Sequence, residues 1–210
     1  MKRFERETVR GWLHEPDHAT GDGIVLTHGA GGDCESPLLK ALAVAFAGNG
    51  FIVLRCDLPY RQQRPHGPPF PAQAVNDREG LKRAVEALRE LVPGRVLLGG
   101  HSYGGRQVTI LAAEQPELVD ALLLLSYPLH PPRKPGQLRT AHFPNLRTPA
   151  LFVHGTRDPF GSVEEMRDAL RTIPACTKLL EAEGAAHALR LDIVPVILRE
   201  TPCLLNASSK

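Results

Sequence analysis

Aromatic side chains, cysteines and net charge are all scarce in this sequence of 210 residues. Phe, Trp and Tyr make up 5% of it, and the formal net charge at pH 7 is only +2. So small a charge provides no electrostatic attraction for nucleic acid or for an anionic membrane surface. No apolar run is long enough to span a bilayer, since the most apolar segment, residues 119–125, has only the length of a strand. We therefore expect neither nucleic acid nor a membrane as a partner.

The four cysteines show neither a C-x-x-C pair nor a regular spacing, so they give no sign of a disulfide framework. They are Cys34, Cys56, Cys176 and Cys203. The sequence also does not begin with a basic segment followed by a long apolar run. These two features lead us to expect reduced thiols and a cytoplasmic location.

Prolines, by contrast, are numerous, and they cluster in two stretches, residues 65–71 and 128–135, which we interpret as loops. The sequence shows neither an internal repeat nor a linker that would divide the chain. A length of 210 residues suffices for one domain with a sizeable core. We therefore expect residues 1–210 to form a single domain.

Short apolar runs alternate with helical patterns along the chain, which predicts a mostly parallel sheet with helices on both faces. The predicted strands are residues 24–27, 51–55, 95–99, 121–126, 150–154 and 178–181. The predicted helices are residues 36–48, 77–91, 102–114, 162–170 and 189–199, the last bent or interrupted at Pro195. Residues 8–14 are a weaker candidate for an antiparallel edge strand. The prediction is an α/β fold with about six to seven strands.

The segment Gly100-His101-Ser102-Tyr103-Gly104 connects a predicted buried strand to a predicted helix. A G-x-S-x-G motif in this setting is typical of a nucleophile elbow, a turn so sharp that the serine takes strained backbone angles. The flanking glycines allow the strand and the helix to pass each other closely. A chance Gly/Ser turn is the alternative, but the strand before and the helix after favour Ser102 as a nucleophile.

A serine nucleophile needs a base, and that base needs a carboxylate to orient it. Such sites lie at the carboxyl ends of parallel strands, and in this arrangement the acid and then the histidine follow the serine. Among the histidines after Ser102, only His187 follows a late strand. Asp158 follows the strand at 150–154, whereas Asp120 lies at the wrong end of a strand and Asp168 lies inside a helix. The alternatives, a surface histidine and an aspartate that only shapes the Asp-Pro turn, are weaker.

An oxyanion hole is the fourth requirement, and residues 27–32, Thr-His-Gly-Ala-Gly-Gly, follow the first predicted core strand. Backbone N–H groups in such a loop can be aimed at a developing negative oxygen. We predict that the amides of Ala30 and Tyr103 are the two donors. A phosphate-binding loop is the alternative, but the sequence has neither G-x-G-x-x-G nor Gly-Lys-Ser/Thr at this point.

These motifs resemble the α/β-hydrolase superfamily, and more narrowly its small dienelactone-hydrolase-like branch. The resemblance rests on residues 100–106, 28–32 and 155–159, and it extends from about residue 24 to residue 187. Residues 126–132 and 138–140 are similar to a group that includes a testis-expressed protein and a subunit of a chromatin acetyltransferase complex. The resemblance implies an α/β-hydrolase fold without a cap domain and a triad at the three positions found above.

Two departures from this branch accompany the resemblance. The N-terminal part looks too short for the usual pair of leading strands. Dienelactone hydrolases proper use a cysteine nucleophile, whereas this chain has Ser102, which argues against dienelactone itself as the substrate.

The segment His14-Glu15-Pro16-Asp17-His18 matches H-E-x-x-H, a zinc motif that works only on a helix. Pro16 argues for a loop instead, so we expect no metal. Cys34 is interpreted as a bystander thiol. Asp57 is interpreted as structural, with Arg106 as a candidate partner.

Basic residues gather in loops that follow strands, and one hypothesis is that they make the mouth of the site electropositive for an anionic acyl substrate. They are Arg61, Arg64, Arg133, Lys134, Arg139 and Arg157. Ordinary solvated arginines and lysines are the alternative interpretation.

The sequence thus predicts a serine hydrolase of small acyl substrates, most simply a carboxylesterase, that needs no cofactor. A thioesterase or peptidase of the same fold is an alternative, because the same machinery serves all three reactions. An alternative of another class is a non-catalytic interaction module on a hydrolase scaffold. The natural substrate and the oligomeric state stay open.

Overall fold

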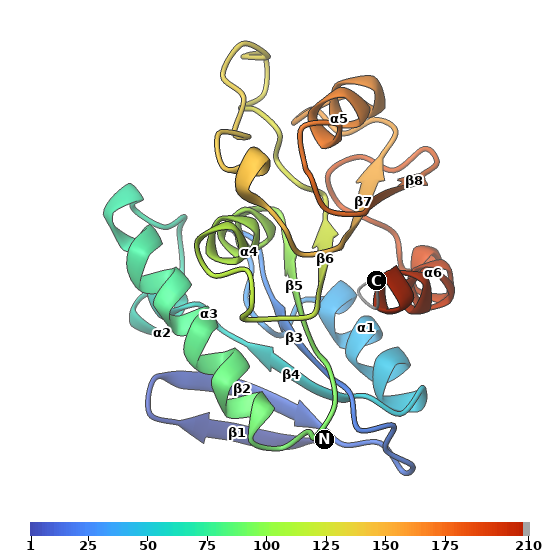
Figure 1. Ribbon diagram of the computed structural model, residues 1–210. Coiled ribbons are helices and arrows are strands. Elements are labelled where there is room, and N and C mark those ends of the chain that lie inside the picture. Colours follow the sequence, from blue (N-terminus) through green and yellow to red (C-terminus); the bar gives the residue numbers. More distant parts are fainter. Residues whose placement is uncertain (208–210) are drawn as a thin grey trace.

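Eight strands form one open sheet in the computed structural model, which describes the backbone of residues 1–207 and the side chains of residues 1–202 (Figure 1). The strands are β1 (Lys2–Arg6), β2 (Val9–His14), β3 (Gly23–Thr27), β4 (Ile52–Cys56), β5 (Val96–His101), β6 (Ala121–Leu125), β7 (Ala150–Gly155) and β8 (Thr177–Ala182). Their order across the sheet is β1-β2-β4-β3-β5-β6-β7-β8. β1 and β2 run antiparallel to their neighbours, and all the other pairs are parallel.

The strand order changes direction at β3, and this places the functional loops. From β3 the chain moves outward to β4, and it later returns to β5 on the other side of β3. Thr27, the last residue of β3, is paired with Gly100 in β5. The loops that follow β3 and β5 therefore leave the same edge of the sheet side by side, which is where open α/β sheets form their ligand crevice.

Helices cover both faces of the sheet, as short crossover connections between parallel strands require. The helices are α1 (Pro37–Gly48), α2 (Pro59–Gln63), α3 (Ala74–Arg89), α4 (Tyr103–Glu114), α5 (Val163–Leu170) and α6 (Val194–Ala207). In Figure 1, α3 and α4 lie on one face, and α1 and α6 lie on the other. Short 3₁₀ turns stand at Pro71–Gln73, Phe143–Asn145 and Leu191–Ile193.

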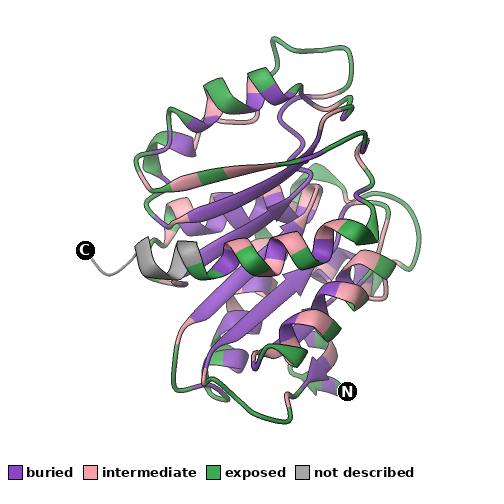
Figure 2. Cartoon of the chain, turned by 90° about the vertical axis from the view of Figure 1, so that its right-hand side faces the viewer, coloured by how far each residue is buried: buried purple, intermediate pink, exposed green. Residues whose placement is uncertain are grey.

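The central strands are buried on both faces because successive side chains point into different halves of the core. In β6, Leu122 and Leu124 belong to the cluster under α3 and α4, whereas Leu123 and Leu125 belong to the cluster under α1 and α6. Figure 2 shows the resulting pattern of buried strands beneath helices whose outer faces are exposed. This double burial explains why these segments read as continuous apolar runs rather than alternating ones.

All six predicted core strands are present, and the candidate strand at residues 8–14 is confirmed as the antiparallel β2, but the expectation of too short an N-terminal part was wrong. The chain does have a leading pair of strands, β1 and β2, which form a hairpin. β2 is not an edge strand, because it lies between β1 and β4. The alternating charged sequence of β1 buries only Phe4, so it carries no apolar run that would have signalled a strand.

The last helix also differs from its prediction. Residues 191–193 form a 3₁₀ turn, and α6 runs from Val194 to Ala207. Pro195 stands in the first turn of α6, where a missing N–H costs nothing, and so it does not interrupt the helix. Among the described helices, none combines the length and the apolar character that crossing a membrane requires. The side chain of Cys203 lies outside the described residues.

The irregular segment between β6 and β7 is anchored to the body of the domain rather than forming a cap. Leu129, Phe143 and Leu146 are buried in the core under α4. His142 lies 2.8 Å from the hydroxyl of Thr109, measured from its Nε2 atom. Burial, followed by the charges of Arg106 and Arg78, lowers the pKa of His142 to about 4.

We predict that His142 makes the fold less stable in acid. The unfolded chain takes up a proton near the ordinary histidine pKa of 6.5, whereas the folded chain resists protonation until about pH 4. The stability contributed by the neutral ring is therefore present above pH 6.5 and is lost as the pH falls toward 4. His142→Gln keeps a donor for Thr109 but does not titrate. Its unfolding free energy should fall by about 1 kcal/mol less than that of the wild type between pH 7 and 4.5, a value reduced for solvent screening.

Denaturant unfolding at the two pH values measures this difference. Equal losses in the two proteins would contradict it.

Candidate active site

Ser102 stands in the sharp turn between β5 and α4, with φ 51° and ψ −114°. Positive φ is costly for a residue with a side chain, and such strain persists only where the surroundings enforce it. The Ser102 amide donates to the carbonyl of Leu125 at 2.8 Å, which ties the turn to the end of β6. The predicted elbow is thus present in its backbone geometry.

Glycines make the turn possible because there is no room for a Cβ atom on either side of Ser102. A Cβ on Gly104 would lie 2.4 Å from the carbonyl oxygen of His28, and one on Gly100 would lie 2.5 Å from the amide nitrogen of Gly105. Real Cβ contacts are never this short. The close approach of α4 to both β5 and the loop after β3 therefore depends on these positions.

The structure brings Ser102, His187 and Asp158 together from three different loops. His187 Nε2 lies 2.7 Å from Ser102 Oγ, and His187 Nδ1 lies 2.8 Å from Asp158 Oδ2. Asp158 follows β7, and its Oδ1 atom accepts the amide of Phe160 at 2.9 Å. The Asp158 side chain is fully buried, whereas His187 keeps 23% of its side chain exposed.

The loop that carries His187 is held by contacts that the sequence did not reveal. The Phe160 ring packs against the imidazole of His187 with 4.2 Å between ring centroids. His101 Nε2 lies 3.3 Å from the carbonyl oxygen of His187. Burial, with the nearby His187, lowers the pKa of His101 to about 4, so His101 is neutral at pH 7 and its Nε2–H can donate. These contacts connect the histidine loop directly to the elbow.

The loop at residues 28–32 is fixed by hydrogen bonds to its carbonyl groups. The Tyr60 hydroxyl donates to the carbonyls of Gly29 and Ala30, at 3.1 and 3.0 Å. The Arg61 guanidinium donates to the carbonyls of Ala30 and Gly32, at 3.0 and 2.8 Å. Because α2 binds the carbonyl side of this loop, the loop has a defined shape without regular secondary structure.

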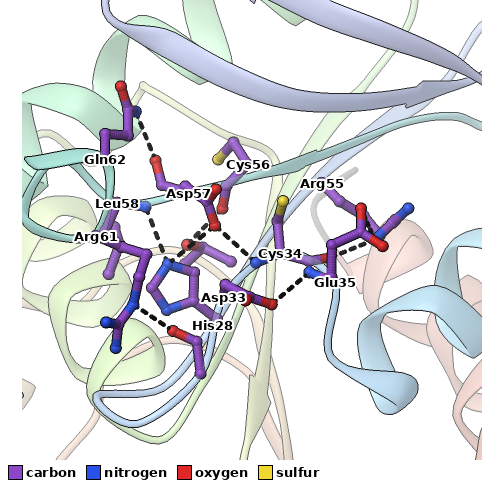
Figure 3. A network of polar contacts seen from close by, with 12 residues as sticks. His28, Asp33, Cys34, Glu35, Arg55, Cys56, Asp57, Leu58, Arg61 and Gln62 are labelled. Atoms are coloured by element: carbon purple, nitrogen blue, oxygen red, sulfur yellow. Dashed lines mark hydrogen bonds and ion pairs between the residues drawn. The ribbon is translucent and has the colours of Figure 1, made fainter. Parts of the chain in front are cut away.

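His28 and Asp57 complete this support (Figure 3). His28 Nδ1 donates to the carbonyl of Gly29 at 2.8 Å, and His28 Nε2 accepts the amide of Leu58 at 3.1 Å. Burial lowers the pKa of His28, which keeps the ring neutral in the tautomer that these two bonds require. Asp57 Oδ1 accepts the amide of Cys34 at 2.7 Å. The suggested pairing of Asp57 with Arg106 is wrong, because Asp57 serves the loop after β3.

The two predicted oxyanion donors lie beside Ser102. Tyr103 is the first residue of α4, so its amide has no acceptor within the helix. Ala30 and Ser102 line the same two cavities at this edge of the sheet. The Tyr103 hydroxyl donates a hydrogen bond to the buried Asp77 at 2.7 Å, which fixes the position of this side chain. Burial raises the pKa of Asp77.

Two cavities flank Ser102. The first has a volume of about 490 Å³, and it has apolar walls that include Phe70, Ile110 and Pro128. The second, of about 400 Å³, is lined by the 28–32 loop together with His101 and His187. Phe160 borders both. The site is therefore open on two sides of the serine hydroxyl.

Only one of the six basic residues proposed for the mouth, Arg139, lines a cavity beside Ser102. Arg61 is buried, and its guanidinium donates hydrogen bonds to four backbone carbonyls. Arg64 stacks on Phe70 with its guanidinium carbon 4.4 Å from the ring centroid. Arg78 and Arg106, which the sequence reasoning did not select for this role, line the larger cavity.

The structure also places the H-E-x-x-H match and three of the four cysteines. Among the described residues, no group of three His, Cys, Asp or Glu side chains is placed so that it could hold a metal ion. His14 of the H-E-x-x-H match lies at the end of β2 and accepts the Nε–H of the buried Arg55. Cys34, Cys56 and Cys176 are free, and burial raises the pKa of Cys56 to about 12. Burial also raises the pKa of the Cys34 thiol, so this thiol stays protonated and is a poor nucleophile.

A family model described as an alpha/beta hydrolase domain matches residues 21–193. The match covers most of the sequence, so this protein belongs to the α/β hydrolase family.

Solved structures share the whole fold at low sequence identity. Est1E from Butyrivibrio proteoclasticus, solved with ferulic acid, superimposes with a TM-score of 0.77 at 18% identity and covers 99% of this chain and 100% of its own. A dienelactone hydrolase from Anabaena variabilis gives 0.75 at 21% identity, covering 98% and 97%. An α/β serine hydrolase without a lid from Xanthomonas campestris gives 0.73 at 19%, covering 93% and 88%.

Curated relatives match by sequence over shorter stretches. A protein of Aquifex aeolicus, provisionally named a carboxymethylenebutenolidase, is 28% identical over 82% of this chain and 78% of its own length. A protein of Haemophilus influenzae, provisionally named an esterase/lipase, is 31% identical over 49% of this chain but only 33% of its own length.

We predict that Gly104→Ala destabilises the fold although alanine normally favours a helix. The new methyl group would meet the His28 carbonyl at 2.4 Å, and forcing α4 outward should cost about 2 kcal/mol of unfolding free energy. Gly48→Ala, in α1, is the matched control because nothing lies within 4 Å of its Cβ position. That variant should be stabilised by up to about 1 kcal/mol.

Chemical denaturation of both variants checks the pair. Equal effects of the two substitutions would show that the elbow does not depend on this contact.

Proposed function

We propose that the protein is a serine hydrolase that cleaves small carboxylic esters. The observation that carries the proposal is the continuous chain of contacts from Ser102 Oγ through His187 to Asp158, at 2.7 and 2.8 Å. These three groups match the roles of nucleophile, general base and orienting acid. The provisional names of two relatives, an esterase/lipase and a carboxymethylenebutenolidase, support the same class of reaction.

In this mechanism Ser102 Oγ attacks the acyl carbonyl while His187 Nε2 takes its proton. Asp158 accepts the Nδ1–H of His187, which fixes the tautomer and stabilises the imidazolium ion that forms. The amides of Ala30 and Tyr103 stabilise the oxyanion. His187 then gives its proton to the leaving alcohol, and a water molecule cleaves the acyl-enzyme by the same steps in reverse.

Thioesters and short peptide bonds stay as alternative substrates, because they pass through the same tetrahedral intermediate. The open site and the absence of a cap favour short acyl groups over long lipid chains. A purely non-catalytic interaction module is disfavoured by the strained backbone of Ser102, since a binding surface gives no physical reason to maintain that strain.

We predict that a fluorophosphonate probe labels the wild-type protein and that Ser102→Ala abolishes the labelling. The probe reacts only with a hydroxyl that a neighbouring base has activated. Ser162→Ala is the control, because this serine caps α5 by accepting the amide of Glu165 and takes no part in the site. Gel fluorescence and intact mass measure the label. A folded wild-type protein that stays unlabelled would favour the interaction module instead.

We predict that Asp158→Asn lowers kcat on a short p-nitrophenyl ester by about 10⁴-fold, because the amide permits the wrong imidazole tautomer. Asp168→Asn is an exposed change in α5, where the carboxylate pairs with Arg171. This variant should stay within about twofold of the wild type, as surface pairs contribute little. Initial rates of nitrophenolate release provide the measurement. A similar loss in both variants would contradict the role of Asp158.

A further inference from the structure

The larger cavity beside Ser102 is lined by both apolar and positively charged side chains. Three arginines reach it, namely Arg78, Arg106 and Arg139. None of the described residues that line it is acidic. A cavity that is lined by half-buried cationic groups and by no carboxylate favours a ligand that supplies the negative charge.

Arg106 is the clearest case. Its Nε atom is shielded from solvent and has no hydrogen-bond partner in the described part of the chain, where no carboxylate forms an ion pair with its guanidinium either. Buried donors are nearly always satisfied, and an unsatisfied charged donor is costly. Its backbone lies one helical turn beyond Ser102 in α4, so this cation lies in the cavity wall close to the serine.

The two neighbouring arginines differ in their partners. Arg78 is held by Glu114, with its Nε atom 3.2 Å from a carboxylate oxygen. Arg139 has no carboxylate partner among the described residues, and its only side-chain bond is a long one of 3.3 Å to the carbonyl of Pro128. Burial and the proximity of Arg106 lower the pKa of Arg139. Two positive charges in this cavity thus lack a carboxylate partner among the described side chains.

The position of His187 distinguishes the two cavities. The leaving oxygen must receive its proton from His187, so the leaving group has to lie on the side of the imidazole. His187 lines the smaller cavity, whereas the residues of the larger one do not include it. The acyl part of the ester is therefore assigned to the larger cavity, where the arginines lie.

We propose that the substrate is a monoester of a short dicarboxylic acid, whose free carboxylate binds Arg106 with help from Arg139. This inference rests on the serine hydrolase function proposed above. Guanidinium groups bind carboxylates through paired, charge-assisted N–H donors, and the apolar walls contact the methylene chain. The ester C–O bond breaks, water supplies the new hydroxyl of the acid, and the products are the alcohol and a dicarboxylate.

The test compares monomethyl adipate with dimethyl adipate, which has the same acyl chain and leaving group but no charge. Wild-type kcat/KM per ester group should be at least about tenfold higher for the monoester, the size expected for a hydrogen-bonded charged pair. Arg106→Gln should remove this preference, so that within this variant kcat/KM per ester group becomes about equal for the monoester and the diester. Arg139→Gln should reduce the preference more weakly, and it provides a second variant if Arg106→Gln fails to fold.

Arg171→Gln is the matched control, because this arginine is exposed, lines neither cavity beside Ser102 and, among the described residues, pairs only with Asp168. It should retain the wild-type preference. A second pair of substrates, 3-acetoxypropanoate and its methyl ester, places the carboxylate on the alcohol side and should show no preference.

The outcomes separate the two proposals. If dimethyl adipate is hydrolysed and the fluorophosphonate labels Ser102, but the monoester has no advantage, the carboxylate subsite is wrong and the hydrolase function stands. If only 3-acetoxypropanoate is hydrolysed faster than its uncharged methyl ester, and the monoester is not hydrolysed faster than dimethyl adipate, the proposed carboxylate subsite is also wrong. If neither adipate ester is cleaved and Ser102 is not labelled, both proposals fail.

Discussion

The backbone strain at Ser102 is the constraint on which the rest of the site depends. A serine with φ 51° persists only because β5 is paired on both sides and α4 packs directly against its end. The glycines at 100 and 104 let these elements approach to distances that no side chain would permit. One turn thereby places the hydroxyl at the edge of the sheet and leaves the first amides of α4 without helical acceptors beside it.

Side chains that take no part in the proposed chemistry hold the other loops in place around this turn. Tyr60, Arg61 and His28 bind the carbonyls of the loop after β3, while His101 and Phe160 hold the loop that carries His187. Burial keeps His28 and His101 neutral, so that each ring can serve as a donor in a fixed tautomer. Preorganisation of this kind is what allows a weakly acidic hydroxyl to be activated without large movements.

The sequence predicted the core strands and the three converging side chains because each has a local signature. Buried parallel strands are continuous apolar runs, and G-x-S-x-G, Asp-Pro and the small-residue loop before His187 follow such strands. Of the leading pair, β1 escaped detection because its burial depends on a tertiary partner and Phe4 is its only buried residue, whereas residues 8–14 were already a candidate antiparallel strand. Arg106 escaped because nothing in the spacing shows which of 25 basic residues keeps its charge unpaired inside a cavity. Local periodicity predicts the strands and helices of the domain. Whether a charged side chain finds a partner of opposite charge depends on how the loops come together in the folded protein.

The most direct test of this account is a crystal structure of the protein after reaction with a short alkyl fluorophosphonate. The account predicts a covalent bond from Ser102 Oγ to phosphorus, with the phosphoryl oxygen about 2.7–3.1 Å from the amides of Ala30 and Tyr103. It also predicts that the alkyl chain enters the cavity lined by Arg106. An unmodified serine, or a phosphoryl oxygen that points toward His187 instead of these amides, would contradict it.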